Sequence, residues 1–368
     1  LQPDPALPQD ARGKGLRPKP FVFTDLTGLA AAGFDTIIDV RSPSEFAEDR
    51  VPGAVSMPVL SDAERARVGT IHAQDSPFAA RRVGGALVAR NTARHVEDHL
   101  SDKPRDWRPL VYCWRGGQRS GAFATVLAQI GWDVAVLDGG YRTWRRHVAT
   151  RLYDEALPLT FIRLDGLTGT GKTAILTRVA AMGGQVIDLE GLARHRGSIL
   201  GDLETGQPAQ KGFESALMEA VETLDADRPV LVEAESARIG SVRLPPGLWA
   251  AMRGAPRIMV SADPAARAAY LARDYADLTE RTAALAEKLD GLRALAGHAR
   301  AEAWQAMLAA GQHTALAAAL IADHYDPAYR RARARDDGQV LAELSAGDLS
   351  ESALDHAARA VLERLNRR

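Results

Sequence analysis

The stretch from Leu159 to Leu176, LTFIRLDGLTGTGKTAIL, constrains the fold of this chain more than any other. It contains Gly166, four further residues, and then Gly171, Lys172 and Thr173. The apolar run before the glycines predicts a strand, and the run that follows Lys172 predicts a helix. A strand, turn and helix in this order indicate a parallel sheet with helices on its faces. The spacing is that of a phosphate-binding loop, the Walker A pattern.

In such a loop the backbone N–H groups face phosphate oxygens. We expect Lys172 to reach a terminal phosphate, and Thr173 is the metal ligand if Mg²⁺ is used. The loop binds a diphosphate, and diphosphates also occur on molecules other than nucleotides. The expected phosphate-binding residues are Gly166, Gly169, Thr170, Gly171, Lys172, Thr173, Arg267 and Arg273. The two arginines lie where small P-loop kinases place lid arginines, or are surface charges.

A Walker B acid should end a neighbouring apolar strand, and PVLVEAES offers Glu233 and Glu235. Asp is more usual there, and Glu235 could instead brace the following loop.

Strand-like and helix-like runs alternate along both halves of the chain, without a shared motif or a fixed repeat, which predicts two α/β units. The expected division is a tail over 1–20, a parallel-sheet domain over 21–148, a phosphate-loop domain over 149–275 and a helical region over 276–368.

The chain has one cysteine, Cys113, in YCWRGGQRS. It ends a predicted strand, and Gly116 and Gly117 allow a tight turn before a helix that we expect to begin near Ser120. Such a loop can direct backbone N–H groups at the sulfur, with Arg115 and Arg119 adding positive charge. These effects favour a thiolate, hence a nucleophile or a carrier of a transferable chalcogen atom. The alternative is a structural cysteine beside an incidental glycine turn.

Composition limits the classes of function. With 46 Lys and Arg against 47 Asp and Glu, the net charge of −1 argues against a generally basic nucleic-acid binder. No apolar run approaches the roughly 18 residues of a membrane span, the start lacks a secretory signal, and one cysteine forms no internal disulfide. We expect a cytoplasmic protein that does not bind membranes. Local basic runs are candidate nucleic-acid contacts or solvated faces. Their arginines are Arg142, Arg145, Arg146, Arg194 and Arg196.

Two segments around the cysteine loop carry a resemblance. The runs DVRSPSEFAEDRVPGAVSMP (39–58) and VLDGGYRTW (136–144) are similar to the framing signatures of rhodanese domains, with the cysteine loop between them in the rhodanese order. Asp39 and Arg41 are then expected to brace loops and not to act in catalysis. Rhodanese-like domains carry sulfur as a persulfide, which implies that Cys113 carries sulfur or selenium. Because no second cysteine is present, the atom would pass directly to an acceptor or be removed by an external thiol.

The segments that link the two motifs make the resemblance more specific. These segments, 64–88, 186–202, 206–217 and 232–245, together with CWRGGQRS and GLTGTGKT, resemble the tRNA 2-selenouridine synthase family from about residue 35 to about residue 275. The implied fold is an N-terminal rhodanese-like parallel-sheet domain, a P-loop NTPase-like α/β domain and a helical C-terminal part.

The family implies a two-step reaction on the wobble 2-thiouridine of tRNA. Geranyl diphosphate first alkylates the 2-thio group, and selenium from selenophosphate then displaces the geranylated sulfur. The phosphate loop with Lys172 would hold the diphosphate. Cys113, assisted by Arg115 and Arg119, would receive selenium as a perselenide-type adduct or position its donor. The resemblance implies no tightly bound cofactor and leaves open whether the reaction uses Mg²⁺. Selenophosphate synthetase is a candidate supplier of selenium.

Other assignments carry less specific signals. The HRGS segment, His195 to Ser198, and Arg194 would contact tRNA or diphosphate, or would be a capping serine and solvated arginines. Aromatic and basic residues around Trp144 and in YRRARAR (329–335) would contact the anticodon loop. One rival enzyme is an ATP-dependent tRNA sulfurtransferase. A tRNA-binding regulator with an inactive rhodanese unit is disfavoured by the intact Cys113 loop.

Overall fold

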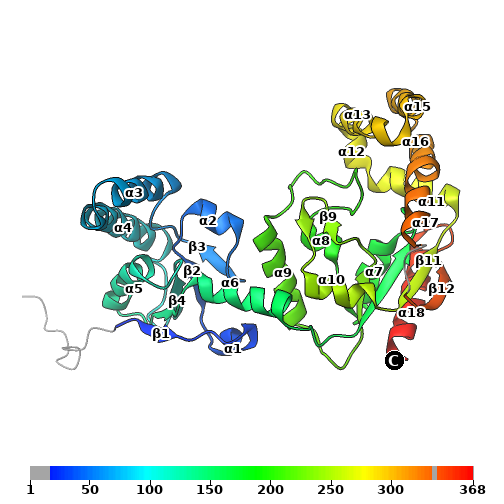
Figure 1. The fold of residues 1–368 in the computed structure, drawn as a ribbon. Helices are drawn as coiled ribbons and strands as arrows, with labels where there is room; N and C mark the ends of the chain where they lie inside the picture. The colour runs from blue at the N-terminus through cyan, green and yellow to red at the C-terminus, as the bar shows by residue number, and fades with distance from the viewer. Residues whose placement is uncertain (1–16, 334–337, 368) are drawn as a thin grey trace, which may run out of the picture. The chain divides into compact units, whose positions relative to one another are not determined.

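The computed structural model describes residues 17–333 and 338–367. The chain divides into two compact units, Leu1–Thr150 and Arg151–Arg368, each described by itself here. Within the described residues, no helix is both long enough and apolar enough to cross a membrane. Figure 1 shows the elements of both units along the chain.

The first unit is a five-stranded parallel sheet with helices on its faces, as expected for a rhodanese-like domain. The strand order is β1-β5-β4-β2-β3. The strands are β1 (Lys19–Phe21), β2 (Thr36–Asp39), β3 (Ala54–Ser56), β4 (Pro109–Tyr112) and β5 (Ala135–Leu137). The helices are α1 (Leu26–Ala31), α2 (Pro43–Glu48), α3 (Asp62–Gln74), α4 (Pro77–His99), α5 (Gln118–Ile130) and α6 (Tyr141–Ala149).

The central strand β4 is buried along its whole length, so it reads as a continuous apolar run. Its side chains join a core with Ile38, Phe123 and Leu127, all fully buried. Two differences from the sequence expectations appear at the ends of elements. Lys19 and Pro20, assigned to the tail, lie in β1 and pair with β5. Helix α5 begins at Gln118, two residues before the expected start at Ser120.

The second unit is also built on a five-stranded parallel sheet, in the order β12-β11-β6-β8-β7. Its strands are β6 (Phe161–Gly166), β7 (Gln185–Ile187), β8 (Val230–Glu233), β11 (Arg257–Ser261) and β12 (Val340–Ser345), and a hairpin joins β9 (Arg238–Ile239) to β10 (Val242–Arg243). The helices around this sheet are α7 (Lys172–Ala181), α8 (Leu189–Ala193), α9 (Gln210–Glu222), α10 (Pro246–Arg253), α11 (Pro264–Asp274) and α18 (Glu351–Asn366). A π-helical turn, η2 (Thr150–Asp154), follows α6.

The C-terminal part is largely helical, as expected, but it also completes the phosphate-loop sheet. Strand β12 pairs in parallel with β11, and α18 packs its Leu354 and Val361 into the core beneath the sheet. From the sequence we treated 276–368 as a separate helical region. The sequence does not reveal this strand because β12, VLAELS, lies at the edge of the sheet, where three of its residues are exposed and three are partly buried.

The remaining C-terminal helices form a cluster between β11 and β12 with a core of its own. Leu285, Leu289, Trp304 and Leu316 are among the buried residues of that core. The elements are α12 (Ala276–Glu280), α13 (Thr282–Gly291), α14 (Arg293–Ala296), α15 (His298–Ala309), α16 (His313–Leu320), η3 (Ile321–Tyr325) and α17 (Asp326–Arg333).

Candidate functional site

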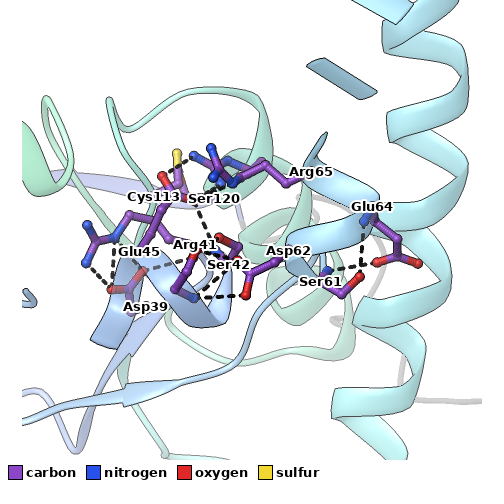
Figure 2. Close-up of polar contacts among 12 residues, drawn as sticks. Asp39, Arg41, Ser42, Glu45, Ser61, Asp62, Glu64, Arg65, Cys113 and Ser120 are labelled. Atoms are coloured by element: carbon purple, nitrogen blue, oxygen red, sulfur yellow. Dashed lines mark hydrogen bonds and ion pairs between the residues drawn. The ribbon is translucent and has the colours of Figure 1, made fainter. Parts of the chain in front are cut away.

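Cys113 lies directly after β4, at the carboxyl end of the sheet, with 4% of its surface exposed. The Ser120 hydroxyl, in the first turn of α5, donates to its sulfur at 3.2 Å (Figure 2). The backbone of Tyr141 donates to the Cys113 carbonyl at 2.8 Å and so joins the loop to α6. Gly116 has φ +66°, and a Cβ there would lie 2.7 Å from the Leu137 carbonyl oxygen, so this turn requires glycine.

The surroundings of Cys113 favour its thiolate. Burial by itself raises the pKa of the thiol, but hydrogen bonds from the side chain and backbone of Ser120 and from the backbone N–H groups of Arg115 and Gly117 oppose it. The result is a Cys113 pKa below its ordinary value. The loop therefore holds a buried sulfur with donors directed at it, as reactive cysteines require.

The two arginines of the loop lie in different settings. Arg119 is paired with Glu45 of α2 at 2.9 Å, and the Arg65 guanidinium lies 3.9 Å from the same carboxylate. Burial raises the pKa of Glu45, but the hydrogen bond and charge of Arg119, the Ser42 backbone N–H and the charge of Arg65 together outweigh it, and the pKa is lowered. Arg115 is exposed. Assistance of Cys113 by Arg115 and Arg119 remains a prediction.

Asp39 and Arg41 form a buried pair next to this loop. Their side chains are 0% and 1% exposed, and the shortest N–O distance between them is 2.7 Å. The Arg41 guanidinium also donates to the Asp49 carbonyl at 2.6 Å and lies over the Tyr141 ring, 3.9 Å from its centroid. This geometry fits the bracing role expected from the sequence.

The phosphate loop connects β6 to α7 as predicted. Gly169 and Gly171 adopt φ +81° and +74°, the left-handed region that favours glycine. Lys172 donates to the Gly166 carbonyl at 3.1 Å, and the Thr170 hydroxyl donates to the Leu167 carbonyl within the loop. A cavity of about 320 Å³ lies against the loop from Thr168 to Thr173. We call it the phosphate-loop cavity.

Three glutamates lie next to the start of α7. The Thr173 hydroxyl lies 3.1 Å from Glu190 Oε2 and 3.2 Å from Glu233 Oε1. Burial and then the neighbouring Glu190 raise the pKa of Glu233 well above its ordinary value and that of Glu235 to about 8. The pKa of Glu190 is also raised, mainly by burial. Burial lowers the pKa of Lys172, but Tyr329 and then these three carboxyls together outweigh it, and the pKa is raised.

The two arginines expected at the phosphates have other contacts. Arg267 is 3% exposed, donates to the Thr168 carbonyl at 2.9 Å and pairs with Asp326 at 2.6 Å. It therefore supports the loop from behind. Arg273 is exposed, with its guanidinium 5.2 Å from the centroid of the Tyr270 ring. Neither arginine lines the phosphate-loop cavity, and their contact with phosphate remains a prediction.

The basic residues proposed for tRNA are placed as follows. On α6, Arg142 and Arg146 are exposed and Arg145 is partly buried. The expected stacking by Trp144 is wrong, because the helical period places this side chain in the core, 0% exposed and next to Phe23. Arg194 ends α8 with φ 47° and is exposed, whereas Arg196 lines the phosphate-loop cavity.

Several site residues were not found from the sequence. Ser120 is one, although it lies one helical turn after Gly117 in the quoted motif. Glu190 could have been found, since it follows β7 and the carboxyl ends of parallel strands meet at one edge. Tyr275 and Tyr329 line the phosphate-loop cavity, and the Tyr329 ring centroid lies 5.7 Å from Lys172 Nζ.

Tyr329 was expected at the anticodon loop within the run 329–335. In the structure it faces Lys172 and lines the phosphate-loop cavity, and its contact with the anticodon loop remains a prediction. Arg330 and Arg331 are exposed, and the side chains of 332–335 lie outside those that the structure describes. The described side chains of the run therefore divide between the phosphate-loop cavity and the surface.

Comparison with known proteins matches both units. A model described as "tRNA 2-selenouridine synthase AAA domain" matches residues 159–302, and a model of the rhodanese-like domain matches residues 24–147. Curated relatives with the name tRNA 2-selenouridine synthase include that of Nitrosomonas europaea, 35% identical over 68% of this chain and 66% of the relative. That of Aeromonas salmonicida is 37% identical over 65% of this chain and 64% of the relative. The matched region thus spans slightly less than two thirds of these relatives.

A third relative, from Verminephrobacter eiseniae, extends the match to most of both chains. It carries the same name and is 33% identical over 345 residues, which cover 85% of this chain and 92% of the relative.

Proposed function

Because the chain belongs to the tRNA 2-selenouridine synthase family, we propose that it converts wobble 2-thiouridine in tRNA to 2-selenouridine. The observation that carries the proposal is the pairing, in one chain, of a buried thiol with a lowered pKa and a phosphate loop beside a cavity. The Cys113 loop is proposed to bind the selenium donor, and the phosphate loop is proposed to bind a diphosphate. We propose the cytoplasm as its place of action, as expected from the sequence.

The proposed reaction has two steps. In the first, the 2-thio sulfur attacks the first carbon of geranyl diphosphate, the carbon–oxygen bond breaks, and diphosphate leaves with the electron pair. In the second, water attacks the phosphorus of selenophosphate, and the phosphorus–selenium bond breaks to give phosphate and hydrogen selenide. The selenide then attacks C2 of the base, and the geranylated sulfur leaves with the electron pair of its bond to C2 and takes up a proton as a thiol. Alkylation is needed because a thiocarbonyl sulfur is a poor leaving group and a thiol is a better one.

The phosphate loop is proposed to hold and stabilise the departing diphosphate. Lys172 supplies the positive charge, and the backbone of Gly169 to Thr173 supplies N–H donors. Among the described residues, no group of three or more His, Cys, Asp or Glu is arranged to hold a metal ion. Mg²⁺ nevertheless fits the loop, since it keeps waters and binds phosphate oxygens, and Thr173 and Glu233 add a hydroxyl and a carboxyl.

If Mg²⁺ binds, it neutralises charge on the leaving diphosphate. Thr173 would orient the ion through its hydroxyl, which lies between two glutamate carboxyls. Arg267 would act from behind the loop through the Thr168 carbonyl, and Arg273 would reach phosphate only after its side chain moves from Tyr270. Glu235 completes the acidic group around Lys172.

Cys113 is proposed to handle selenium. Selenium in selenophosphate is at the selenide level, so a perselenide on Cys113 would need a two-electron oxidant. The Cys113 thiolate is therefore proposed to position selenophosphate, with Arg115 and Arg119 close by in the sequence. Selenophosphate synthetase is the proposed supplier of that donor. The arginines of α6, together with Arg194 and Arg196, are the proposed contacts to tRNA phosphates.

Nucleoside mass spectrometry tests this proposal. Thiouridine tRNA is incubated with the protein, geranyl diphosphate and selenophosphate, and wild type is compared with Cys113→Ala and Lys172→Ala. We expect 2-selenouridine from wild type, accumulation of geranylated nucleoside from Cys113→Ala, and unchanged thiouridine from Lys172→Ala. If geranylation never occurs and only ATP with a sulfur donor changes the tRNA, the chain is instead the ATP-dependent sulfurtransferase.

A further inference from the structure

A second cavity, almost entirely apolar, lies beside the phosphate-loop cavity. Its walls come from α11, α12, α13, α16 and η3, the helices between β11 and β12. Leu278, Leu285, Leu316 and Leu320 line it, all at most 6% exposed. We call it the apolar cavity. The helices between β11 and β12 thus form a small apolar hollow next to the phosphate loop.

The two cavities share part of their walls. Thr168, Leu271 and Tyr275 line both. The Tyr275 hydroxyl is hydrogen-bonded to Ser198 at 3.1 Å, and the Arg196 guanidinium lies 4.7 Å from the centroid of its ring. Tyr275 is therefore held in place at the boundary. A ligand whose charged end lies at the phosphate loop would reach the apolar cavity past Leu271 and Tyr275.

From this arrangement we infer that the apolar cavity binds the hydrocarbon chain of a prenyl diphosphate whose diphosphate lies at the phosphate loop. A nucleotide places ribose and base next to its diphosphate, and these polar groups lose hydrogen bonds to water if the walls offer no partners. An apolar chain loses none and gains from leaving water. The inference rests on the proposed function and names where that substrate's chain is held.

Cavity size limits the length of the chain. The apolar cavity measures about 50 Å³ and the phosphate-loop cavity about 320 Å³. The first carbons of the chain would therefore lie in the larger cavity, against Leu271 and Tyr275, and only the end of the chain would enter the smaller one. This geometry favours a ten-carbon chain over a fifteen-carbon chain. Side chains at the far wall would set that limit, and Leu316 and Ala317 of α16 are among them.

Binding measurements on the full chain test the inference without requiring catalysis. Calorimetry compares pyrophosphate, ATP, and the five-, ten- and fifteen-carbon prenyl diphosphates. Wild type should bind geranyl diphosphate at least about tenfold more tightly than pyrophosphate, because several methylene groups leave water. Ala317→Phe, which fills the apolar cavity, should remove most of that gain and leave pyrophosphate affinity unchanged.

Two further variants make the result specific. Ala318→Phe adds the same side chain to the next, exposed position of α16 and should bind like wild type. Leu316→Ala enlarges the cavity and should raise the affinity for the fifteen-carbon chain relative to the ten-carbon chain. This variant also tests the inference if Ala317→Phe fails to fold.

The outcomes separate the inference from the proposed function. If geranyl diphosphate binds tightly but Ala317→Phe and Leu316→Ala leave chain-length preference unchanged, the chain lies elsewhere and the inference is overturned while the proposed function stands. If wild type prefers ATP and binds geranyl diphosphate no better than pyrophosphate, both are overturned.

Discussion

The hydroxyl of Ser120 offers the sharpest test of how the cysteine loop works. It lies 3.2 Å from Cys113 Sγ, and both residues are buried. A hydrogen bond to a charged group contributes about 1.5–3 kcal/mol. Ser120→Ala should therefore lower the ratio of thiolate to thiol by about tenfold to a hundredfold at any fixed pH, since 1.4 kcal/mol is a factor of ten. The backbone donors remain, so part of the thiolate stabilisation should persist.

The single cysteine makes the measurement direct. Ultraviolet absorbance of the thiolate is followed during a pH titration, and the Cys113→Ala protein supplies the background. Thr125→Ala is the matched control, because it removes a hydroxyl from the same helix whose partner is the Gly121 carbonyl. If Ser120→Ala titrates like wild type, the hydroxyl does not stabilise the thiolate, and the loop backbone alone would have to account for the lowered pKa.

Three further predictions concern the buried charges. Asp39→Ala leaves Arg41 buried without its carboxylate and should lower the free energy of unfolding in urea by about 3–5 kcal/mol; Lys19→Ala, at an exposed pair, should cost at most about 1 kcal/mol. The pKa of Glu235, raised from 4.5 to about 8, means that the folded state holds an extra proton in this window, so stability should fall as pH rises through it. Glu235→Gln should flatten that fall in urea titrations at several pH values, and an unchanged slope would contradict the shift. Lys172→Ala should weaken pyrophosphate binding in calorimetry by at least about tenfold, and equal affinity would remove Lys172 from the phosphate site.

Local motifs were predictable from the sequence because their geometry is set within a few residues. The phosphate loop needs the positive φ of Gly169 and Gly171, and the cysteine loop needs that of Gly116. A positive φ favours glycine, so these turns can be recognised from the positions of glycines in the sequence. Most strands of both sheets were found for the same reason, as short apolar runs between turn residues, whereas β12 and the start of β1 were not.

Contacts between distant segments were not predictable in this way. Tyr329 reaches Lys172 from 157 positions along the chain, as the residue numbers give (329 − 172), and nothing in YRRARAR distinguishes the inward-facing Tyr from the outward-facing Arg. Trp144 shows the opposite error. The basic residues around it suggested that its side chain lies on the surface, but the helical period places that side chain in the core. Strand β12 escaped notice because an edge strand need not alternate or be apolar.

The acidic group beside Lys172 bears on which ligand the phosphate loop accepts. An ionised diphosphate would be repelled by three ionised glutamates, yet Thr173 lies within 3.2 Å of two of them. Burial resolves the conflict, because it raises the pKa of Glu190 and Glu233 and so favours their neutral forms. A neutral carboxyl donates a hydrogen bond to phosphate where an ionised one would repel it. A bound cation would have the opposite effect and favour ionised carboxylates. The same residues can therefore accommodate a diphosphate with or without Mg²⁺, and the two cases differ in the number of protons that the loop holds.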